Sequence, residues 1–333
     1  MANNNFDFLR IALAVTVFYM HMGILADIDL LSYLPGEFSV KCFFVISGYL
    51  IVKSFIRNPE IFSYYRSRFF RIYPLYFIVV SVCFVFGYLN YSQSFEAYMN
   101  GGAEKYLLSN YIFANFLAST LPGLFENNAM AVVNGSLWTI KVEVMFYISV
   151  PIIYGYLNKY LQERILTCVI AVFSLLSYYV IGHLVETYGL NASLNNQLPS
   201  LMLFFMVGAF FNFYNFSFLN KSHLLFIIPL LFLMDDFYLL YSLLVGSFVY
   251  IVAFVIKPIV IRKEIGDISY GIYLWHFPVI QVVIMYGLFD NLYVGFAIAS
   301  ISVFSLSLFS WHFIESKLIK KSKKHVMQTD VLN

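Results

Sequence analysis

Long apolar runs constrain the fold of this chain more than any other feature. Of its 333 residues, 61% are hydrophobic and 11% are charged, whereas soluble domains carry about 25% charged residues. A helix of about 20 apolar residues crosses the bilayer core, which is about 30 Å thick. We therefore expect an all-α integral membrane protein, a polytopic bundle of about ten transmembrane helices near 8–26, 37–56, 73–92, 137–157, 165–185, 198–214, 219–234, 238–256, 268–288 and 292–314.

The basic residues predict which side of the membrane each loop faces. With the N-terminus in the cytoplasm, all but three of the 20 Lys and Arg residues fall on the inner side, the exceptions being Lys41, Lys105 and Lys141. This positive-inside bias predicts that both termini are cytoplasmic. Residues 315–333 would form a short basic tail. Because Ser and Asn interrupt the run 106–121, we expect an outer-side or re-entrant helix there rather than a span.

Several other classes of site find no support in the sequence. The first apolar run lacks a basic segment before it and a cleavage pattern after it, so we expect it to stay as a span. The three cysteines lie in apolar runs without metal-ligand spacing, so we expect neither a disulfide framework nor a metal site. No internal repeat, fused soluble domain or nucleic-acid-binding pattern is visible. We therefore expect residues 1–333 to form a single membrane-embedded domain.

Two ionisable side chains, Arg10 and His21, lie inside the first apolar run. Their separation corresponds to about 16 Å of helix and about 20° beyond three whole turns, so they share one face. An ionisable group inside a span costs about 3 kcal/mol and usually has a function in a protein interior or water-filled cavity. We therefore expect a functional pair, although a snorkelling arginine and a structural histidine would give the same pattern.

A carboxylate at the outer start of the run 137–157 can be matched to His21 by depth. Counted along ideal helices, Glu143 lies about 9 Å below the outer surface and His21 about 20 Å above the inner one, which agrees in a core of about 30 Å. A carboxylate can fix the tautomer of an imidazole, which then takes a proton near neutral pH. We therefore predict His21 as a general base that Glu143 orients.

Four arginines lie between the second and third runs, in a segment from Arg57 to Pro74 that we expect to be a cytoplasmic loop. Pro74 would open the third span, where its missing N–H costs nothing. Arg68 and Arg71 are three residues apart, so in a helical segment they would share a face and could grip one phosphate. A loop that is basic only because it is cytoplasmic remains the alternative.

His276 lies inside the ninth run, about 12 Å above the inner surface by the same helix count. Pro278 cannot donate to the carbonyl of Leu274, so a backbone acceptor should be free beside His276. Together with Trp275 this pattern indicates a lined cavity, although a buried histidine bonded to a neighbouring helix would also fit. Ser47 precedes Gly48, and we favour close helix packing over a nucleophilic serine there.

Several short motifs occur in one order along nearly the whole chain. They are Arg10 with ten residues to His21, Phe43-Phe-Val-Ile-Ser47-Gly48, Arg68-x-x-Arg71-Ile-x-Pro74, Ser136-Leu-Trp138 followed by Val142-Glu143, Ser269-Tyr-x-x-Tyr273-Leu-Trp-His276, and Phe313-Ile-Glu315. The ordered set resembles the acyltransferase family 3 of integral membrane O-acyltransferases. Members of that family commonly move an acetyl group from acetyl-CoA to a hydroxyl of a surface glycan or lipid-linked sugar.

The resemblance implies a role for each candidate residue in a membrane O-acetyltransferase of the cell inner membrane. His21 would act as general base or acyl relay with Glu143. Arg10, Arg68 and Arg71 would bind the phosphates of acetyl-CoA, with no metal. The acceptor, a surface polysaccharide of the O-antigen or exopolysaccharide type or a lipid-linked glycan, would meet Trp138, Tyr273 and His276.

One alternative function remains open from the sequence. A multi-pass transporter or lipid-linked sugar flippase would also use intramembrane polar residues and Pro-broken spans. Such a protein commonly shows repeat symmetry between its halves, which this sequence lacks. The sequence leaves open which sugar and hydroxyl are acylated, whether the acyl group is acetyl, whether transfer passes through an acyl-enzyme, and the oligomeric state.

Overall fold

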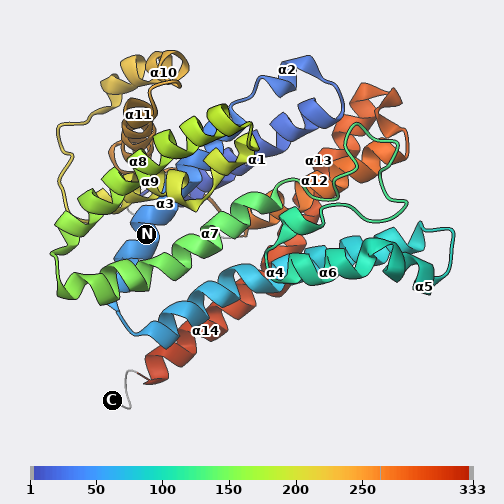
Figure 1. The fold of residues 1–333 in the computed structure, drawn as a ribbon, viewed down its shortest axis with the longest axis horizontal. Coiled ribbons are helices and arrows are strands. Elements are labelled where there is room, and N and C mark those ends of the chain that lie inside the picture. The colour runs from blue at the N-terminus through green and yellow to red at the C-terminus, as the bar shows by residue number, and fades with distance from the viewer. Residues whose placement is uncertain (1–3, 263, 330–333) are drawn as a thin grey trace. The chain divides into compact units, whose positions relative to one another are not determined.

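The structure is a computed structural model that describes residues 4–262 and 264–329, and its assigned elements are all helical (Figure 1). The chain divides into two compact units. The first unit comprises the described residues of Met1–Leu13 together with Glu37–Tyr64 and Val142–Val260. The second comprises Ala14–Gly36, Tyr65–Lys141 and the described residues of Ile261–Asn333. The prediction of an all-α protein is confirmed.

Seven helices in the described part of the chain are long and apolar enough to cross a membrane. Many of them expose large apolar side chains, such as Phe173 and Leu176 on α8, which suits contact with lipid. The seven are built on α1 (Phe6–Leu25), α3 (Gly36–Arg57), α4 (Ile61–Leu89), α7 (Leu137–Val150) with η3 (Pro151–Tyr156), α8 (Glu163–Tyr188), α11 (Tyr238–Tyr250) with η7 (Ile251–Val255), and α13 (Leu292–Ser310). The chain is therefore a multi-pass membrane protein.

Three of the predicted spans form shorter helices, so a count of about ten full spans is not confirmed. They are α9 (Leu198–Phe210), α10 (Leu224–Leu233) and α12 (Ser269–Met285), with 13, 10 and 17 residues. Every residue from Ser200 to Ala209 is buried, as are most residues of α12. A helix covered by protein can end at membrane depth, because its terminal backbone groups can find partners in the protein rather than in lipid.

The remaining elements are short helices that connect the longer ones, together with the last helix, α14. They are α2 (Asp29–Ser32), α5 (Phe95–Tyr98), η1 (Met99–Ala103), α6 (Glu104–Tyr111), η2 (Asn115–Leu117), η4 (Leu157–Lys159), η5 (Ala192–Asn196), η6 (Lys221–His223), η8 (Leu288–Asp290), η9 (Trp311–Glu315) and α14 (Ser316–Thr329).

In the first unit, two glycines bring α3 and α9 into backbone contact. A Cβ atom built on Gly48 would lie 1.9 Å from the carbonyl oxygen of Phe205, and one on Gly208 would lie 1.8 Å from that of Val45. Only residues without a side chain allow two helices to cross this closely. The interpretation of Gly48 as a packing residue is therefore confirmed.

The start of α4 corrects the predicted loop between Arg57 and Pro74. Only residues 58–60 leave the helical conformation, and α4 runs from Ile61 with Pro74 in its interior. The carboxylate of Glu60 accepts hydrogen bonds from the backbone N–H groups of Phe62 and Ser63, which begins the helix. Pro74 removes one helical hydrogen bond, a loss that membrane helices tolerate where neighbouring groups compensate. The prediction that Pro74 opens the span was wrong.

The segment after α4 turns back along that helix. The Tyr98 hydroxyl donates to the carbonyl of Phe84 (2.9 Å), the Tyr111 hydroxyl contacts that of Ser81 (2.8 Å), and the Phe113 ring packs on Tyr76 with 4.6 Å between ring centroids. These contacts make α5, η1 and α6 retrace about 12 Å of α4 in the opposite direction. The run 106–121 thus contains part of α6, which with eight residues is too short to be a span (Figure 1).

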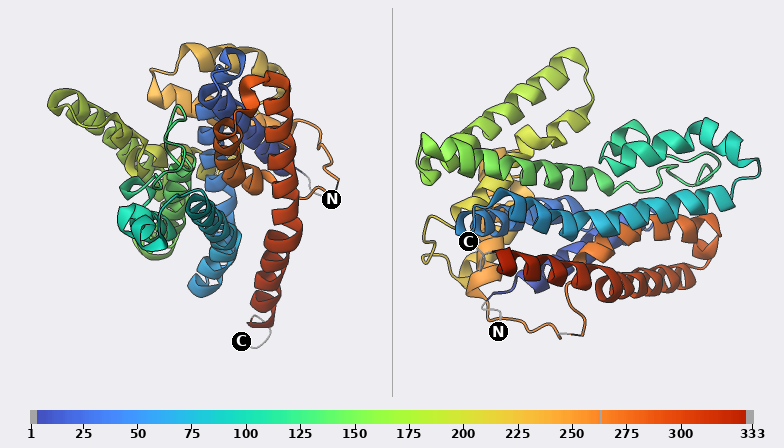
Figure 2. Two further views of the ribbon diagram at one scale, coloured as in Figure 1. Left: turned by 90° about the vertical axis from the view of Figure 1, so that its right-hand side faces the viewer. Right: turned by 90° about the horizontal axis from the view of Figure 1, so that it is seen from below.

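The end of the chain is also more regular than predicted. The left view of Figure 2 shows α13, η9 and α14 as one continuous helix. From Leu292 to Thr329 it would measure about 57 Å, nearly twice the thickness of a bilayer core. The predicted basic tail therefore begins inside a helix, while residues 330–333 lie outside the described residues.

Candidate functional site

Two histidines from distant parts of the sequence meet in the second unit. His21 of α1 and His276 of α12 have 2.9 Å between Nδ1 of His21 and Nε2 of His276. Their rings are stacked, with centroids 5.0 Å apart and planes 19° apart. His276 is fully buried, whereas His21 is partly exposed. The separate helix counts placed these two residues about 8 Å apart in depth. The counts fail because they assume helices that start at the membrane surface, whereas α12 is a short helix of 17 residues, most of them buried.

Pro278 leaves a backbone carbonyl near His276 without its helical donor, and the structure shows the partners of the groups around it. Nδ1 of His276 lies 3.0 Å from the carbonyl oxygen of Ile272. The carbonyl of Leu274, which Pro278 deprives of its helical donor, accepts a hydrogen bond from Nδ2 of Asn134 at 3.0 Å. The predicted backbone acceptor therefore exists, and a side chain from another segment occupies it.

The segment that carries Asn134 is attached to α12 at further points. The Ser136 hydroxyl donates to the carbonyl of Tyr273 (3.2 Å), and the hydroxyls of Thr139 and Tyr273 are 2.6 Å apart. A Cβ atom on Gly135 would lie 2.6 Å from the Phe277 ring, which itself packs edge-on against His21 at 5.3 Å. We call residues 128–139 the latch, because they hold this side of α12 next to the histidine pair.

Gln281 fastens the start of the latch. It is fully buried. Its amide nitrogen donates to the carbonyls of Met130 (2.6 Å) and Val132 (2.7 Å), and its amide oxygen accepts from Asn128 (2.8 Å). The sequence analysis did not single out Gln281, although a lone amide inside an apolar run is a signal of this kind of attachment.

Arg71 is held by two carboxylates of the second unit. Its guanidinium lies 2.6 Å from Asp267 and 3.6 Å from Glu315, and Glu315 is 2% exposed. Arg68, one turn earlier on α4, donates from Nε to the Ser67 hydroxyl at 3.2 Å. The structure therefore gives Arg71 partners that the sequence analysis did not identify. Phosphate binding by this pair stays a prediction.

Glu143 belongs to the first unit, where hydroxyl groups surround it. The Tyr147 hydroxyl donates to the same carboxylate oxygen, Oε1, that lies 3.5 Å from the Ser47 hydroxyl. The carbonyl of Tyr147 in turn accepts from the Tyr64 hydroxyl at 3.0 Å. Glu143 is thus an oriented, partly exposed carboxylate. Its pairing with His21 stays a prediction.

The other predicted site residues have different surroundings. Arg10 is partly exposed on α1, and Trp138 is partly exposed on α7. Tyr273 is 7% exposed and its hydroxyl is engaged by Thr139. The roles of Arg10 in binding acetyl-CoA and of Trp138 and Tyr273 in binding the acceptor are not tested by these contacts.

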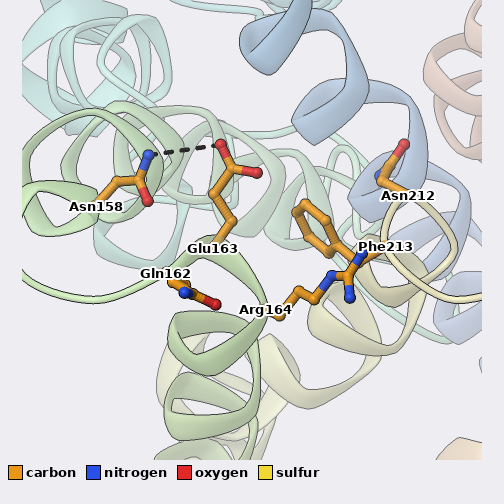
Figure 3. A pocket seen from close by; sticks show the side chains of 6 residues that line it. All are labelled: Asn158, Gln162, Glu163, Arg164, Asn212 and Phe213. Carbon is orange, nitrogen blue, oxygen red and sulfur yellow. Dashed lines mark hydrogen bonds between the residues drawn. The ribbon is translucent and has the colours of Figure 1, made fainter.

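A pocket of about 350 Å³ in the first unit contains none of the predicted site residues (Figure 3). It is lined by Asn158, Gln162, Glu163, Arg164, Asn212 and Phe213. Nδ2 of Asn158 lies 3.5 Å from Oε1 of Glu163, and Nδ2 of Asn212 donates to the carbonyl of Tyr49. Because the pocket contains none of the residues that the sequence singles out, it does not replace the histidine pair as the candidate site.

Comparisons with known proteins agree on one family. The model of acyltransferase family 3, described as an acyltransferase domain, matches residues 3–312. An O-acetyl transferase of Shigella phage Sf6 is 29% identical, over 96% of this chain and 97% of that protein. Nodulation protein 10 of Rhizobium leguminosarum bv. viciae is 25% identical, over 95% of this chain and 93% of that protein.

A third relative, like the first, comes from a virus. The putative acetyltransferase ORF330 of Acidianus two-tailed virus is 24% identical, over 87% of each chain. No solved structure matches this chain. Because the family model covers nearly the whole sequence, the chain belongs to acyltransferase family 3 and is an acyltransferase.

Proposed function

We propose that this protein is a membrane O-acetyltransferase that moves an acetyl group from acetyl-CoA to a hydroxyl of a surface polysaccharide or lipid-linked glycan. Membership of an acyltransferase family supports the reaction class. The name of the relative from phage Sf6, an O-acetyl transferase, supports acetyl as the group and oxygen as its acceptor.

The observation that carries the proposal is the His21 imidazole. It is partly exposed near the end of the apolar helix α1 and lies next to a second, buried imidazole. In the proposed reaction His21 takes the proton of the acceptor hydroxyl while the oxygen attacks the thioester carbonyl. The bond from carbon to sulfur breaks, and the proton returns to the CoA sulfur. A base of this kind contributes about 10²–10⁴ in rate.

Other residues are assigned to the substrates in this proposal. Arg10, Arg68 and Arg71 bind the phosphates of acetyl-CoA, for which guanidinium groups are suited. The ion pairs of Arg71 with Asp267 and Glu315 also hold α4 in place. Trp138 and Tyr273 lie on the path of the glycan. Glu143 supplies a carboxylate to stabilise the positive charge that develops when His21 takes a proton. The acetyl group passes directly to the acceptor hydroxyl, without a covalent intermediate on the enzyme.

The proposed membrane arrangement follows the positive-inside bias. The short helices α9, α10 and α12 accompany the seven longer ones across the cell inner membrane, so that ten crossings leave both termini in the cytoplasm. Reporter fusions after residue 329 test this arrangement. A C-terminal alkaline phosphatase should be inactive and a C-terminal fluorescent protein bright, and the reverse result would exclude it.

The transporter and flippase alternatives are not needed for these residues. The chain belongs to a family of acyltransferases. A histidine pair with one partly exposed member also suits proton transfer from a bound hydroxyl. We therefore keep the enzymatic function as the proposal.

Acetyl transfer in isolated membranes tests the proposed function. Membranes containing wild type, His21→Ala or Arg10→Ala at matched protein levels are given radiolabelled acetyl-CoA, with the host surface glycan as acceptor. We expect alkali-labile label on the glycan with wild type, none above background with His21→Ala, and partial recovery of Arg10→Ala at high acetyl-CoA. Exposed residues of the same types give the controls His183→Ala and Arg262→Ala, which should label like wild type. Equal labelling by His21→Ala would refute the proposal.

A further inference from the structure

The hydrogen bonds of the histidine pair determine where its protons lie. A backbone carbonyl can only accept, so Nδ1 of His276, 3.0 Å from the carbonyl oxygen of Ile272, must carry the proton of that imidazole. In neutral His276 the other nitrogen, Nε2, is then an acceptor. Nδ1 of His21 lies 2.9 Å from this acceptor and must be the donor. The proton of neutral His21 is thus on Nδ1.

This chain of hydrogen bonds leaves Nε2 of His21 with its lone pair. We propose that His276 is a positioning residue that fixes the tautomer and ring orientation of His21, so that Nε2 of His21 is the atom that takes the acceptor proton. The inference rests on the proposed function. It also reassigns His276, which the sequence analysis placed in contact with the acceptor, because a fully buried side chain with both nitrogens engaged is not available to a substrate.

The proposal changes the part played by Glu143. The single Nδ1 proton of neutral His21 is used by His276, so the orienting acceptor predicted to be the Glu143 carboxylate is instead an imidazole. A neutral orienting group keeps the fully buried position uncharged, which is less costly than a buried carboxylate. When His21 takes a proton, the same hydrogen bond stabilises the imidazolium.

His276 can act in this way because α12 is fixed on several sides. Nε1 of Trp275 donates to the Ser310 hydroxyl at 2.9 Å, which ties α12 to α13. A Cβ atom on Gly271 would lie 2.9 Å from the Cα atom of Ser307, so these two helices are in backbone contact. On another side, Asn134 of the latch holds the carbonyl of Leu274. A positioning group must itself be immobile for the base to stay within reach of its proton.

Two substitutions of His276 separate positioning from simple packing. His276→Gln removes the ring but can place an amide oxygen where Nε2 accepted from His21. His276→Phe keeps a ring of similar size and provides no acceptor. If His276 only fills space, the phenylalanine variant should be the more active. If it positions His21, the glutamine variant should be the more active.

We expect His276→Phe to lower kcat for acetyl transfer about 10²-fold, the scale of a misplaced catalytic group, with little change in KM for acetyl-CoA. We expect His276→Gln to retain at least tenfold more kcat than His276→Phe. Folding is monitored by the thermal unfolding of each purified variant. The exposed residue His183, changed to Gln and to Phe, provides the matched controls and should keep wild-type kcat.

The outcomes also distinguish this inference from the proposed function. If wild type transfers no acetyl group, the proposed function fails. If wild type is active and His276→Phe, folded as judged by unfolding, equals or exceeds His276→Gln in kcat, then the positioning role is wrong while the proposed function stands. A change in KM for acetyl-CoA without a change in kcat would likewise overturn the positioning role.

Discussion

The attachment of the latch by Gln281 can be tested through a single substitution. Gln281→Leu keeps a side chain of similar size and removes both donor hydrogens and the acceptor oxygen. The carbonyls of Met130 and Val132 and the amide of Asn128 then lose their side-chain partner. Asn128 keeps its second bond, to the backbone carbonyl of Gln281 at 3.0 Å. The two latch carbonyls therefore bear most of the effect.

The magnitude follows from these two carbonyls. Loss of the partner of a buried polar group costs about 1–3 kcal/mol. Both bonds are only partly buried, so water can replace part of each. We take about 1 kcal/mol for each carbonyl, or about 2 kcal/mol for the latch. Since 1.4 kcal/mol is a factor of ten, opening of the latch should become about 30-fold more frequent.

Hydrogen exchange at Val133 gives the assay. Its backbone N–H donates to the carbonyl of Ser119 at 2.9 Å, and the residue is fully buried. In wild type this amide should therefore exchange slowly. Mass spectrometry of the protein in nanodiscs should show exchange about 30-fold faster in Gln281→Leu, the factor that follows from about 2 kcal/mol. The exposed residue Gln162 provides the control Gln162→Leu, which should not alter this exchange. Unchanged exchange in Gln281→Leu would refute the assignment of the latch.

Three further substitutions follow from the packing and the charges. Gly208→Val should separate α3 from α9 and destabilise the protein by about 1–3 kcal/mol. The control Gly182→Val, whose new Cβ would lie 3.7 Å from its nearest atom, should leave thermal unfolding unchanged. Equal unfolding temperatures of the two variants would contradict the close crossing. Arg71→Ala removes the guanidinium that lies 3.6 Å from the buried carboxylate of Glu315 and should cost about 3–5 kcal/mol. Adding Glu315→Gln should recover part of the thermal stability, so a double variant no more stable than Arg71→Ala would argue against the pair. Asn134→Ala should cost about 1–3 kcal/mol and lower kcat for acetyl transfer, and wild-type values of both would show that this bond is unimportant.

The sequence predicts the class of this fold because apolar runs are a strong local signal. It fails for the length of α12, a helix of 17 residues most of which are buried, since burial by protein and burial by lipid select the same side chains. It fails again at Pro74, which starts a helix in many proteins but lies inside α4 here. The choice depends on neighbouring segments and not on the residue itself.

The candidate site was predictable in parts. His21 stands out because an imidazole within a span is costly, and Pro278 correctly predicts that the carbonyl of Leu274 lacks its helical donor. The partner that fills it, Asn134, lies 140 residues away in sequence. The contact between His21 and His276 also could not be predicted from the sequence, because counting residues along a helix assumes that each helix begins at the membrane surface. Long-range pairing of this kind requires the tertiary structure.

The proposed role of His21 as the base for acetyl transfer is tested most directly by an assay with purified protein. Wild type and His21→Gln in nanodiscs are mixed with acetyl-CoA and the isolated glycan, and release of the CoA thiol and formation of the acetyl ester are followed together. We expect equal amounts of thiol and ester with wild type, and a rate at least 10²-fold lower with His21→Gln, the lower end of the contribution of a general base. Ester formation by His21→Gln at the wild-type rate would contradict this role.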